Sequence, residues 1–233
     1  MALEGMKIEA ARSRNALFDI NGLIVRARTD IAEFQKPFAQ DGAPVSNFAD
    51  AVKALKPTGI IGVSTVPKLF TREVIETMAE VNDRPIIFPY SNPTSRSECA
   101  AEEAYRWSGG RAIFASGSPF PPVEIAGQKF VPGQGNNVYI FPAMGMAVFA
   151  TEATRVTDQM FIVAAKAVAE QVTNEDLSIG LIYPPQSKIF EASLHVAGRV
   201  AEYIFENGLA RVPRPDNIAS LIHARTYRPV YPQ

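Results

Sequence analysis

The feature that most constrains the fold is a regular alternation between residues 59 and 115. Strand-like apolar runs at 59–63, 85–88 and 112–115 alternate with helical patterns, the first of which begins at Thr71. Strands that alternate with helices are typical of βαβ units, whose strands pair in parallel and are covered by helices on both faces. The sequence therefore predicts an α/β fold with a Rossmann-like parallel sheet and helices on both of its faces.

Two further elements are predicted before this alternation. Residues 15–20 form an apolar, strand-like run. The Asn21-Gly22 pair that follows is a turn signal, because both residues tolerate a positive φ. Ser46 or Asn47 can cap a helix over residues 48–55.

Capping residues also indicate where the helices of the alternation begin. Thr71 precedes apolar residues at helical spacing. Ser95 and Glu98 have the spacing of a capping box for a helix that runs through Tyr105. Gly109-Gly110 predicts the end of that helix.

The chain changes character after the third predicted strand. Residues 117–135 are rich in Gly and Pro and predict a long loop with little regular structure beyond a short turn near Gly127. The tail beyond Pro213 predicts an extended segment that packs on a surface through Tyr227 and Tyr231.

The remaining sequence predicts a C-terminal helical segment. We therefore expect a domain built on the parallel sheet over residues 1–155, followed by helices and a tail over residues 156–233 that pack on it. Thr157-Asp158 and Thr173 are further expected helix caps. The predicted helices cover roughly residues 143–154, 158–171 and 187–207.

Composition excludes several classes of protein. Lys and Arg total 23 against 24 Asp and Glu, so the net charge of -1 gives no reason to expect a nucleic acid or an acidic membrane as partner. No apolar run reaches the ~20 residues that span a bilayer. The single Cys99 excludes an internal disulfide and is better explained as a small buried residue than as a nucleophile. We expect a cytoplasmic protein, or one in an organelle interior.

Small and polar residues follow three successive predicted strands. Ser64-Thr65 ends the first, Ser91-Asn92 the second and Ser116-Gly117-Ser118 the third. Ligands of open parallel sheets bind at the carboxyl ends of the strands. Small residues let a ligand approach the backbone, and the hydroxyl and amide groups offer hydrogen bonds without charge. Three such ends in succession favour a ligand cleft over ordinary polar turns.

Two other positions could contact a ligand. Asp19 ends the first predicted strand, where an acidic residue of a dinucleotide fold accepts hydrogen bonds from the adenosine ribose. The alternative is an acidic turn residue. Asn136 and Asn137 follow a Gly-x-Gly turn that could hold a small polar ligand, or that could be a solvated turn. No GxGxxG motif occurs in the chain.

Catalytic residue types are scarce. The two histidines, His195 and His223, are better explained as structural or exposed residues than as catalytic ones. No HExxH motif and no paired-carboxylate spacing occurs. Taken alone, the residues predict a binding fold without an evident acid, base or metal centre.

The chain nevertheless resembles a known family, the large-type malic enzymes, in their C-terminal part. The resemblance covers about residues 2 to 207 and implies the oxidation of malate with NAD or NADP, followed by decarboxylation to pyruvate and CO₂ with a bound Mg²⁺ or Mn²⁺. Five segments carry it, in the family's order and spacing: IIGVSTVPKLFT, RPIIFPYSNPTSRSECAAEEAY, GRAIFASGSPF, PGQGNNVYIFPAMG and LIYPP.

The resemblance also implies roles for individual residues. Asn92 matches the asparagine near the nicotinamide ribose and the substrate, and Asn136 and Asn137 match a pair that contacts the substrate, with either one able to dominate. Asp19 matches the acidic residue at the adenosine ribose. Val63, Ser64 and Ser91 match positions that line the dinucleotide cleft.

The same resemblance bears on the choice of cofactor. Gln35 falls where NADP-preferring members have a lysine, and Asp19 repels a 2′-phosphate, so NAD is favoured over NADP. Lys36 is adjacent, and a shift of the match by one residue would reverse the argument.

Much of the family's machinery is implied to lie before residue 1. The general-acid tyrosine, the general-base lysine, the metal-binding carboxylates, the first strand and the glycine-rich loop are all missing, so we assign no catalytic residue and no metal ligand here. Residues 1–155 are thereby implied to form an incomplete NAD(P)-binding, Rossmann-type domain. We expect the chain alone to be inactive and marginally stable or aggregation-prone. We also expect the missing N-terminal part to be its partner and the complete enzyme to be a homo-oligomer.

A non-catalytic nucleotide-binding or interaction module of the same fold is the alternative function. A short-chain dehydrogenase is disfavoured, because no Tyr-x-x-x-Lys spacing occurs.

Overall fold

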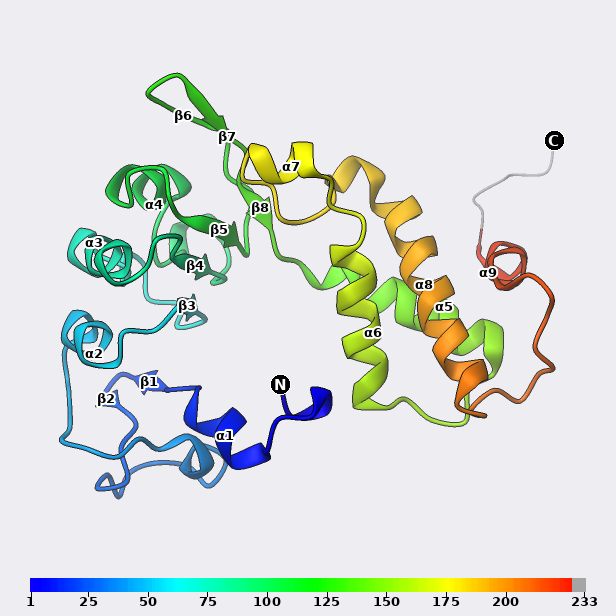
Figure 1. Cartoon of the computed structure of the whole chain (residues 1–233), viewed down its shortest axis with the longest axis horizontal. Coiled ribbons are helices and arrows are strands. Elements are labelled where there is room, and N and C mark those ends of the chain that lie inside the picture. The colour runs from blue at the N-terminus through cyan, green and yellow to red at the C-terminus, as the bar shows by residue number, and fades with distance from the viewer. Residues whose placement is uncertain (228–233) are drawn as a thin grey trace. The chain divides into compact units, whose positions relative to one another are not determined.

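The computed structural model describes residues 1–227, which divide into two compact units between Pro132 and Gly133 (Figure 1). Each unit is described by itself. The domain division expected at residue 155 stays a prediction.

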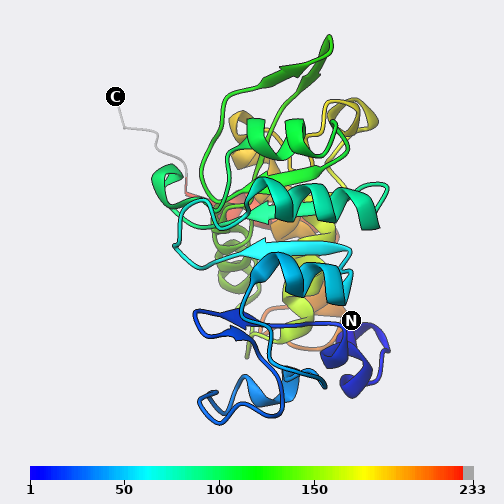
Figure 2. The same cartoon turned by 90° about the vertical axis from the view of Figure 1, so that its left-hand side faces the viewer.

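The first unit is built on three parallel strands, β3 (Gly59–Gly62), β4 (Ile86–Pro89) and β5 (Ile113–Ser116). They are neighbours in chain order, with Ile86 of β4 opposite Gly59 of β3 and Ile113 of β5. Each passage from one strand to the next contains a helix (Figure 2). The predicted α/β fold with a parallel, Rossmann-like sheet is therefore confirmed. The helices of this unit are α1 (Ile8–Ser13), α2 (Phe48–Leu55), α3 (Arg72–Val81) and α4 (Ala101–Trp107).

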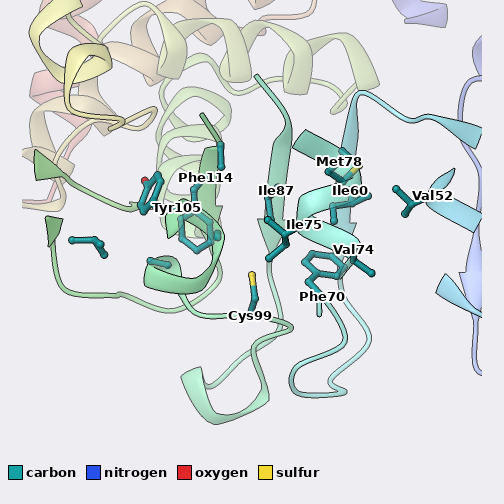
Figure 3. Packing of buried hydrophobic residues seen from close by; sticks show 14 of the residues in the cluster. Val52, Ile60, Phe70, Val74, Ile75, Met78, Ile87, Cys99, Tyr105 and Phe114 are labelled. Carbon is teal, nitrogen blue, oxygen red and sulfur yellow. The ribbon is translucent and has the colours of Figure 1, made fainter. Parts of the chain in front are cut away.

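One face of this sheet carries the hydrophobic core of the unit (Figure 3). Ile87 and Phe114 of the sheet are fully buried there, and so are Ile75 and Met78 of α3. Each such side chain contributes about 1.5–3 kcal/mol through its removal from water. Ile61 alternates to the opposite face, where it is 63% exposed. The core therefore holds α2, α3 and α4 against a single face of these strands, so this unit does not show the expected cover of helices on both faces.

Of the predicted helix caps, Asn47, Thr71 and Thr173 are confirmed. The pair of Ser95 and Glu98 is wrong, and Thr157 precedes a helix at Asp158 but its side chain makes no capping hydrogen bond. The side chain of Asn47 accepts from Asp50 N at the start of α2, and that of Thr71 caps α3. At α4, however, the backbone N–H of Ala100 donates to Glu103. The expected pair of Ser95 and Glu98 does not cap α4, because the Glu98 side chain is fully buried among the strand ends.

Two short hairpins also differ from the prediction. The first strand is only Phe18–Asp19 (β1), paired antiparallel with Gly22–Leu23 (β2). The predicted loop over 117–135 contains a hairpin of β6 (Val123–Ile125) and β7 (Gln128–Phe130). Its two turn residues, Ala126 and Gly127, have φ of 51° and 79°. Such turns favour Asn or Asp first, and Ala126 gave no such signal.

The second unit is helical after a short strand, β8 (Gly133–Gln134), and a 3₁₀ turn over Asn137–Tyr139. The three long helices predicted for this region are confirmed, and α8 packs against α5, α6 and α9. Val196, Val200 and Ile204 of α8 are fully buried in that contact. The helices are α5 (Phe141–Thr151), α6 (Asp158–Ala169), α7 (Asn174–Ser178), α8 (Ile189–Glu206) and α9 (Ile218–Arg225).

The extended tail predicted beyond Pro213 is wrong in its central part. Asn217 accepts a hydrogen bond from Ser220 N and so caps α9, which occupies most of this segment. Tyr227 is 82% exposed and packs on no surface, and Tyr231 lies outside the described residues. Among the helices of residues 1–227, none has the length and apolar character needed to cross a membrane.

Candidate functional site

A buried carboxylate joins the carboxyl ends of β3 and β4. Glu98 Oε1 accepts from the backbone N–H of Ser64 at 3.0 Å, from Ser64 Oγ at 2.8 Å and from Ser91 Oγ at 2.5 Å. Its Oε2 accepts from Ser91 N at 3.4 Å. The Ser91 hydroxyl also accepts from Thr65 N. Both serine hydroxyls are therefore directed at the protein, and a ligand meets their backbone and outer surface.

Gly62 makes room for this carboxylate. A Cβ on Gly62 would lie 2.4 Å from Cδ of Glu98. Because no side chain stands there, Glu98 can reach across the last residue of β3 to the turn that follows. Val63, the next residue, is 75% exposed, and Ser64 is also exposed.

Asn92 lies at the end of β4 and is held from β5. Ser118 Oγ donates to Asn92 Oδ1 at 2.6 Å, and Ser118 itself is buried. Gly117 lies against the same carboxamide, since a Cβ there would lie 3.0 Å from Asn92 Nδ2 and 2.2 Å from the carbonyl oxygen of Tyr90. The structure thus brings together the predicted residues Ser64, Ser91 and Asn92 at one edge of the sheet.

Asp19 lies in β1 and forms an ion pair that the sequence reasoning missed. Arg28 donates to both oxygens of Asp19, at 2.9 and 3.0 Å, and to both oxygens of Asp30, at 2.9 and 2.7 Å. It also donates to the carbonyl oxygen of Gly22. These hydrogen bonds from Arg28 hold the pKa values of Asp19 and Asp30 below their usual range. Only 9% of the Arg28 side chain is exposed.

The residues near the expected phosphate-discriminating position are engaged locally. Gln35 Oε1 accepts from the backbone N–H of Ala32 at 2.8 Å, within the same turn. The ammonium group of Lys36 is paired with Glu33. In this geometry, the Gln35 carboxamide oxygen and the Lys36 ammonium group are therefore both already paired with neighbouring residues of the chain.

Asn136 and Asn137 belong to the second unit. Asn136 Oδ1 accepts from Val138 N at 2.9 Å and caps the 3₁₀ turn that Asn137 begins. Both residues are exposed. The expected tight Gly-x-Gly turn before them is wrong, since Gly133 and Gln134 form the extended strand β8.

A divalent metal does not fit the residues present. Within residues 1–227, no three or more His, Cys, Asp or Glu side chains come together in a way that could hold a metal ion. The carboxylates of Asp19 and Asp30 are both bound to Arg28, and those of Glu170 and Glu202 are both bound to Arg199. No metal-dependent step can therefore be derived from this chain.

Three residues of these clusters were not predicted as site residues. Arg28 and Asp30 lie in a segment without regular periodicity, so only the Arg-x-Asp spacing marked them. Glu98 was interpreted as a helix cap, a common role for glutamate after a serine. Its burial against Ser64, 34 residues earlier, leaves no trace in the local sequence.

Comparisons with known proteins found a matching family model and similar proteins. A family model described as the malic enzyme NAD-binding domain matches residues 1–205. An NADP-dependent malic enzyme of Vitis vinifera is 53% identical over 226 residues, which are 96% of this chain and 38% of that protein. The chloroplastic NADP-dependent malic enzyme 4 of Arabidopsis thaliana is 49% identical over 96% of this chain and 35% of that protein.

A solved structure shows the same fold. The malic enzyme of Entamoeba histolytica matches 90% of this chain and 41% of its own, with a TM-score of 0.68 and 22% sequence identity, a level that supports the fold alone. The chain spans little more than a third of the length of the curated relatives named above. The matched family model and these identities establish that the chain belongs to the malic enzyme family, in the region of its NAD-binding domain.

Proposed function

We propose that this chain is the nucleotide-binding part of an enzyme that oxidises malate and decarboxylates it to pyruvate. Family membership and the gathering of Ser64, Ser91 and Asn92 at the carboxyl ends of parallel strands support this proposal. The bound nicotinamide would supply the hydride acceptor. Asn92 would contact its ribose and the substrate, and Val63 would line the cleft.

Asn136 and Asn137 are the further residues that we propose to contact the substrate. Asn137 carries a carboxamide with no hydrogen-bond partner among residues 1–227, whereas Asn136 uses its carboxamide oxygen to cap the turn. We therefore assign the larger share of malate contact to Asn137. Asn136 retains two N–H donors for the same ligand.

The cofactor we propose is NAD. The main support for NAD over NADP is the Arg28 network, which consists of Arg28, Asp19, Asp30 and the carbonyl oxygen of Gly22. A guanidinium has five N–H donors. All five are used, by Asp19, Asp30 and the carbonyl oxygen of Gly22. A 2′-phosphate would have to displace one of these carboxylates and would meet the net negative charge of the group. The ribose 2′-hydroxyl of NAD needs only an acceptor, and Asp19 Oδ2 accepts just one of these bonds.

The relatives named above are NADP-dependent, so the two cofactors must be compared directly. We expect the chain to bind NAD about tenfold more tightly than NADP in a calorimetric titration, a difference of about 1.4 kcal/mol. Equal or tighter binding of NADP would contradict the choice of NAD. Binding of neither would contradict the nucleotide-binding function itself.

Two variants locate the origin of the preference. Asp30→Ala frees two Arg28 donors and should raise the affinity for NADP while leaving that for NAD nearly unchanged. Asp41→Ala is the matched control, because it removes the same charge from an exposed pair with Arg26. Gln35→Lys should also favour NADP, since it supplies a cation where NADP-preferring members resemble one another in having a lysine.

A nucleotide-binding module without turnover is the second candidate, favoured by the lack of a metal-binding group among residues 1–227. Malate, NAD and Mn²⁺ are added to the chain, and NADH is followed by absorbance. NADH formation excludes the module. Its absence from a folded sample supports the module for the chain alone.

The oligomeric state and the cellular location of the complete enzyme are also part of the proposal. We propose that the chain works in a homo-oligomer together with the remaining part of the polypeptide. The cytoplasm, or an organelle interior as for the Arabidopsis thaliana relative that is named chloroplastic, is the proposed location.

A further inference from the structure

We infer that Ser118 is a positioning residue that fixes the orientation of the Asn92 carboxamide, so that its NH₂ group faces the ligand. The inference rests on the proposed function, because the ligand is the nucleotide or substrate assigned to this edge of the sheet. It adds a residue to the site and states which chemical group Asn92 offers. That group is a donor, and its partner is a ligand oxygen.

The Ser118 hydroxyl is itself held in place. Ser118 is 6% exposed, and Ser116 Oγ donates to its carbonyl oxygen at 2.8 Å across the turn that ends β5. Gly117 N in the same turn donates to the carbonyl oxygen of Pro89 at 3.1 Å, which ties the turn to β4. The hydroxyl therefore meets Asn92 from a rigid support rather than from a mobile loop.

Gly117 closes the other side of the carboxamide. A Cβ at Gly117 would lie 3.0 Å from Asn92 Nδ2, which is closer than an ordinary van der Waals contact. The Asn92 carboxamide therefore has room in this position because residue 117 has no side chain. The 2.6 Å hydrogen bond from Ser118 engages Oδ1. With Oδ1 held, rotation of the amide about its terminal bond would break this hydrogen bond.

The chemistry of the exposed side follows from this orientation. A carboxamide has one acceptor oxygen and two N–H donors. Asn92 is exposed, and no residue within 1–227 accepts from its Nδ2. The donors are thus available to a ligand oxygen, from the nicotinamide riboside half of the dinucleotide or from the malate carboxylate.

The test compares NAD with ADP, which lacks the nicotinamide riboside half. The intact chain and Ser118→Ala are titrated with each nucleotide, with and without malate. We expect Ser118→Ala to weaken NAD binding by about threefold to tenfold, as for the loss of one hydrogen bond, and to leave ADP binding unchanged. Ser108→Ala is the matched control, since Ser108 is also buried and its hydroxyl bonds to the backbone of Tyr105 and Ala112.

Two further variants test the mechanism. In an Asn92→Ala background, Ser118→Ala should have no further effect on NAD, because Ser118 acts through Asn92. Asn92→Asp keeps an acceptor for Ser118 but places an oxygen where Nδ2 stands. It should lose NAD affinity as Asn92→Ala does, and its exposed position keeps the fold intact.

The results of these titrations distinguish the positioning role of Ser118 from the proposed nucleotide-binding function. An effect on NAD alone assigns the ligand oxygen to the nucleotide, and an effect only with malate assigns it to the substrate. Equal losses for NAD and ADP, no loss at all, or the same loss in the Asn92→Ala background would overturn the positioning role. Full NAD affinity in Asn92→Asp would overturn the donor orientation. Binding of neither nucleotide by the unaltered chain contradicts the proposed function and this inference with it.

Discussion

Gly62 and Glu98 are complementary in shape, because the carboxylate of Glu98 occupies the space that a side chain on Gly62 would fill. A Cβ on Gly62 would lie 2.4 Å from Glu98 Cδ and 2.6 Å from Oε2. Glu98 cannot move aside without losing the hydrogen bonds from Ser64 and Ser91. The buried position of Glu98 therefore depends on a glycine at residue 62, at the end of β3.

We expect Gly62→Ala to destabilise the chain by about 2–3 kcal/mol, at the upper end of what overpacking a core costs. The measurement is urea unfolding followed by circular dichroism. Gly198→Ala is the control, because Gly198 lies within α8 with no atom near its Cβ position. That variant should gain about 0.5–1 kcal/mol. Equal changes in the free energy of unfolding for the two variants would show that the Glu98 side chain can move away from Gly62 at little cost.

Glu98→Gln should cost about 1–3 kcal/mol of unfolding free energy, since it removes a charged acceptor from buried donors. One amide oxygen cannot replace two carboxylate oxygens, and the new NH₂ group meets the N–H of Ser91. Glu102→Gln, in an exposed pair with Arg106, should change stability by less than about 0.5 kcal/mol. If the two losses are similar, the Glu98 network contributes little.

The parallel sheet could be predicted because its evidence is local. The apolar runs of β3, β4 and β5 and caps such as Asn47 and Thr71 each depend on a few neighbouring residues. The hairpin over β6 and β7 could not be predicted in the same way. Its turn is formed by Ala126 with a positive φ, a conformation that alanine rarely adopts.

The candidate site was predicted only in part, for a related reason. The serines and asparagines at the strand ends could be found because chain topology places them at one edge. Their partners could not. Glu98 contacts Ser64 across 34 residues, and Ser118 contacts Asn92 across 26. The sequence pattern shows which polar residues lie at the carboxyl edge of the sheet, but it does not show which of them form hydrogen bonds with one another.

The Arg28 network predicts a dependence of stability on pH. Hydrogen bonds from Arg28 lower the pKa of Asp30 in the folded chain. A lowered pKa contributes stability above the unfolded value of about 3.9, and that contribution is lost as the pH falls through the folded value. Asp30→Asn should therefore be less stable than the unaltered chain near neutral pH, and the difference should decrease as the pH falls below about 3.9.

Urea unfolding of both proteins, from about pH 7 down to about pH 2, gives this difference directly. Asp41→Asn is the control, because 87% of the Asp41 side chain is exposed. A difference between Asp30→Asn and the unaltered chain that persists unchanged into acid would place its origin outside the ion pair.

Tyr105 offers a stability gain. It is fully buried and stacked on Phe130, with ring centroids 4.5 Å apart, but its hydroxyl has no hydrogen-bond partner within residues 1–227. Burial raises the pKa of this phenol, which therefore remains neutral. Tyr105→Phe keeps the stacked ring and removes the unpaired hydroxyl, so stability should stay equal or rise by up to about 1 kcal/mol.

Tyr139 provides the matched comparison, because it is also buried but its hydroxyl donates to the carbonyl oxygen of Pro184. Tyr139→Phe should lose about 0.5–1.5 kcal/mol, the usual net value of one hydrogen bond. The two substitutions delete the same atom, so opposite signs in urea unfolding would isolate the effect of its partner. A loss in Tyr105→Phe as large as that in Tyr139→Phe would show that the Tyr105 hydroxyl is hydrogen-bonded in solution.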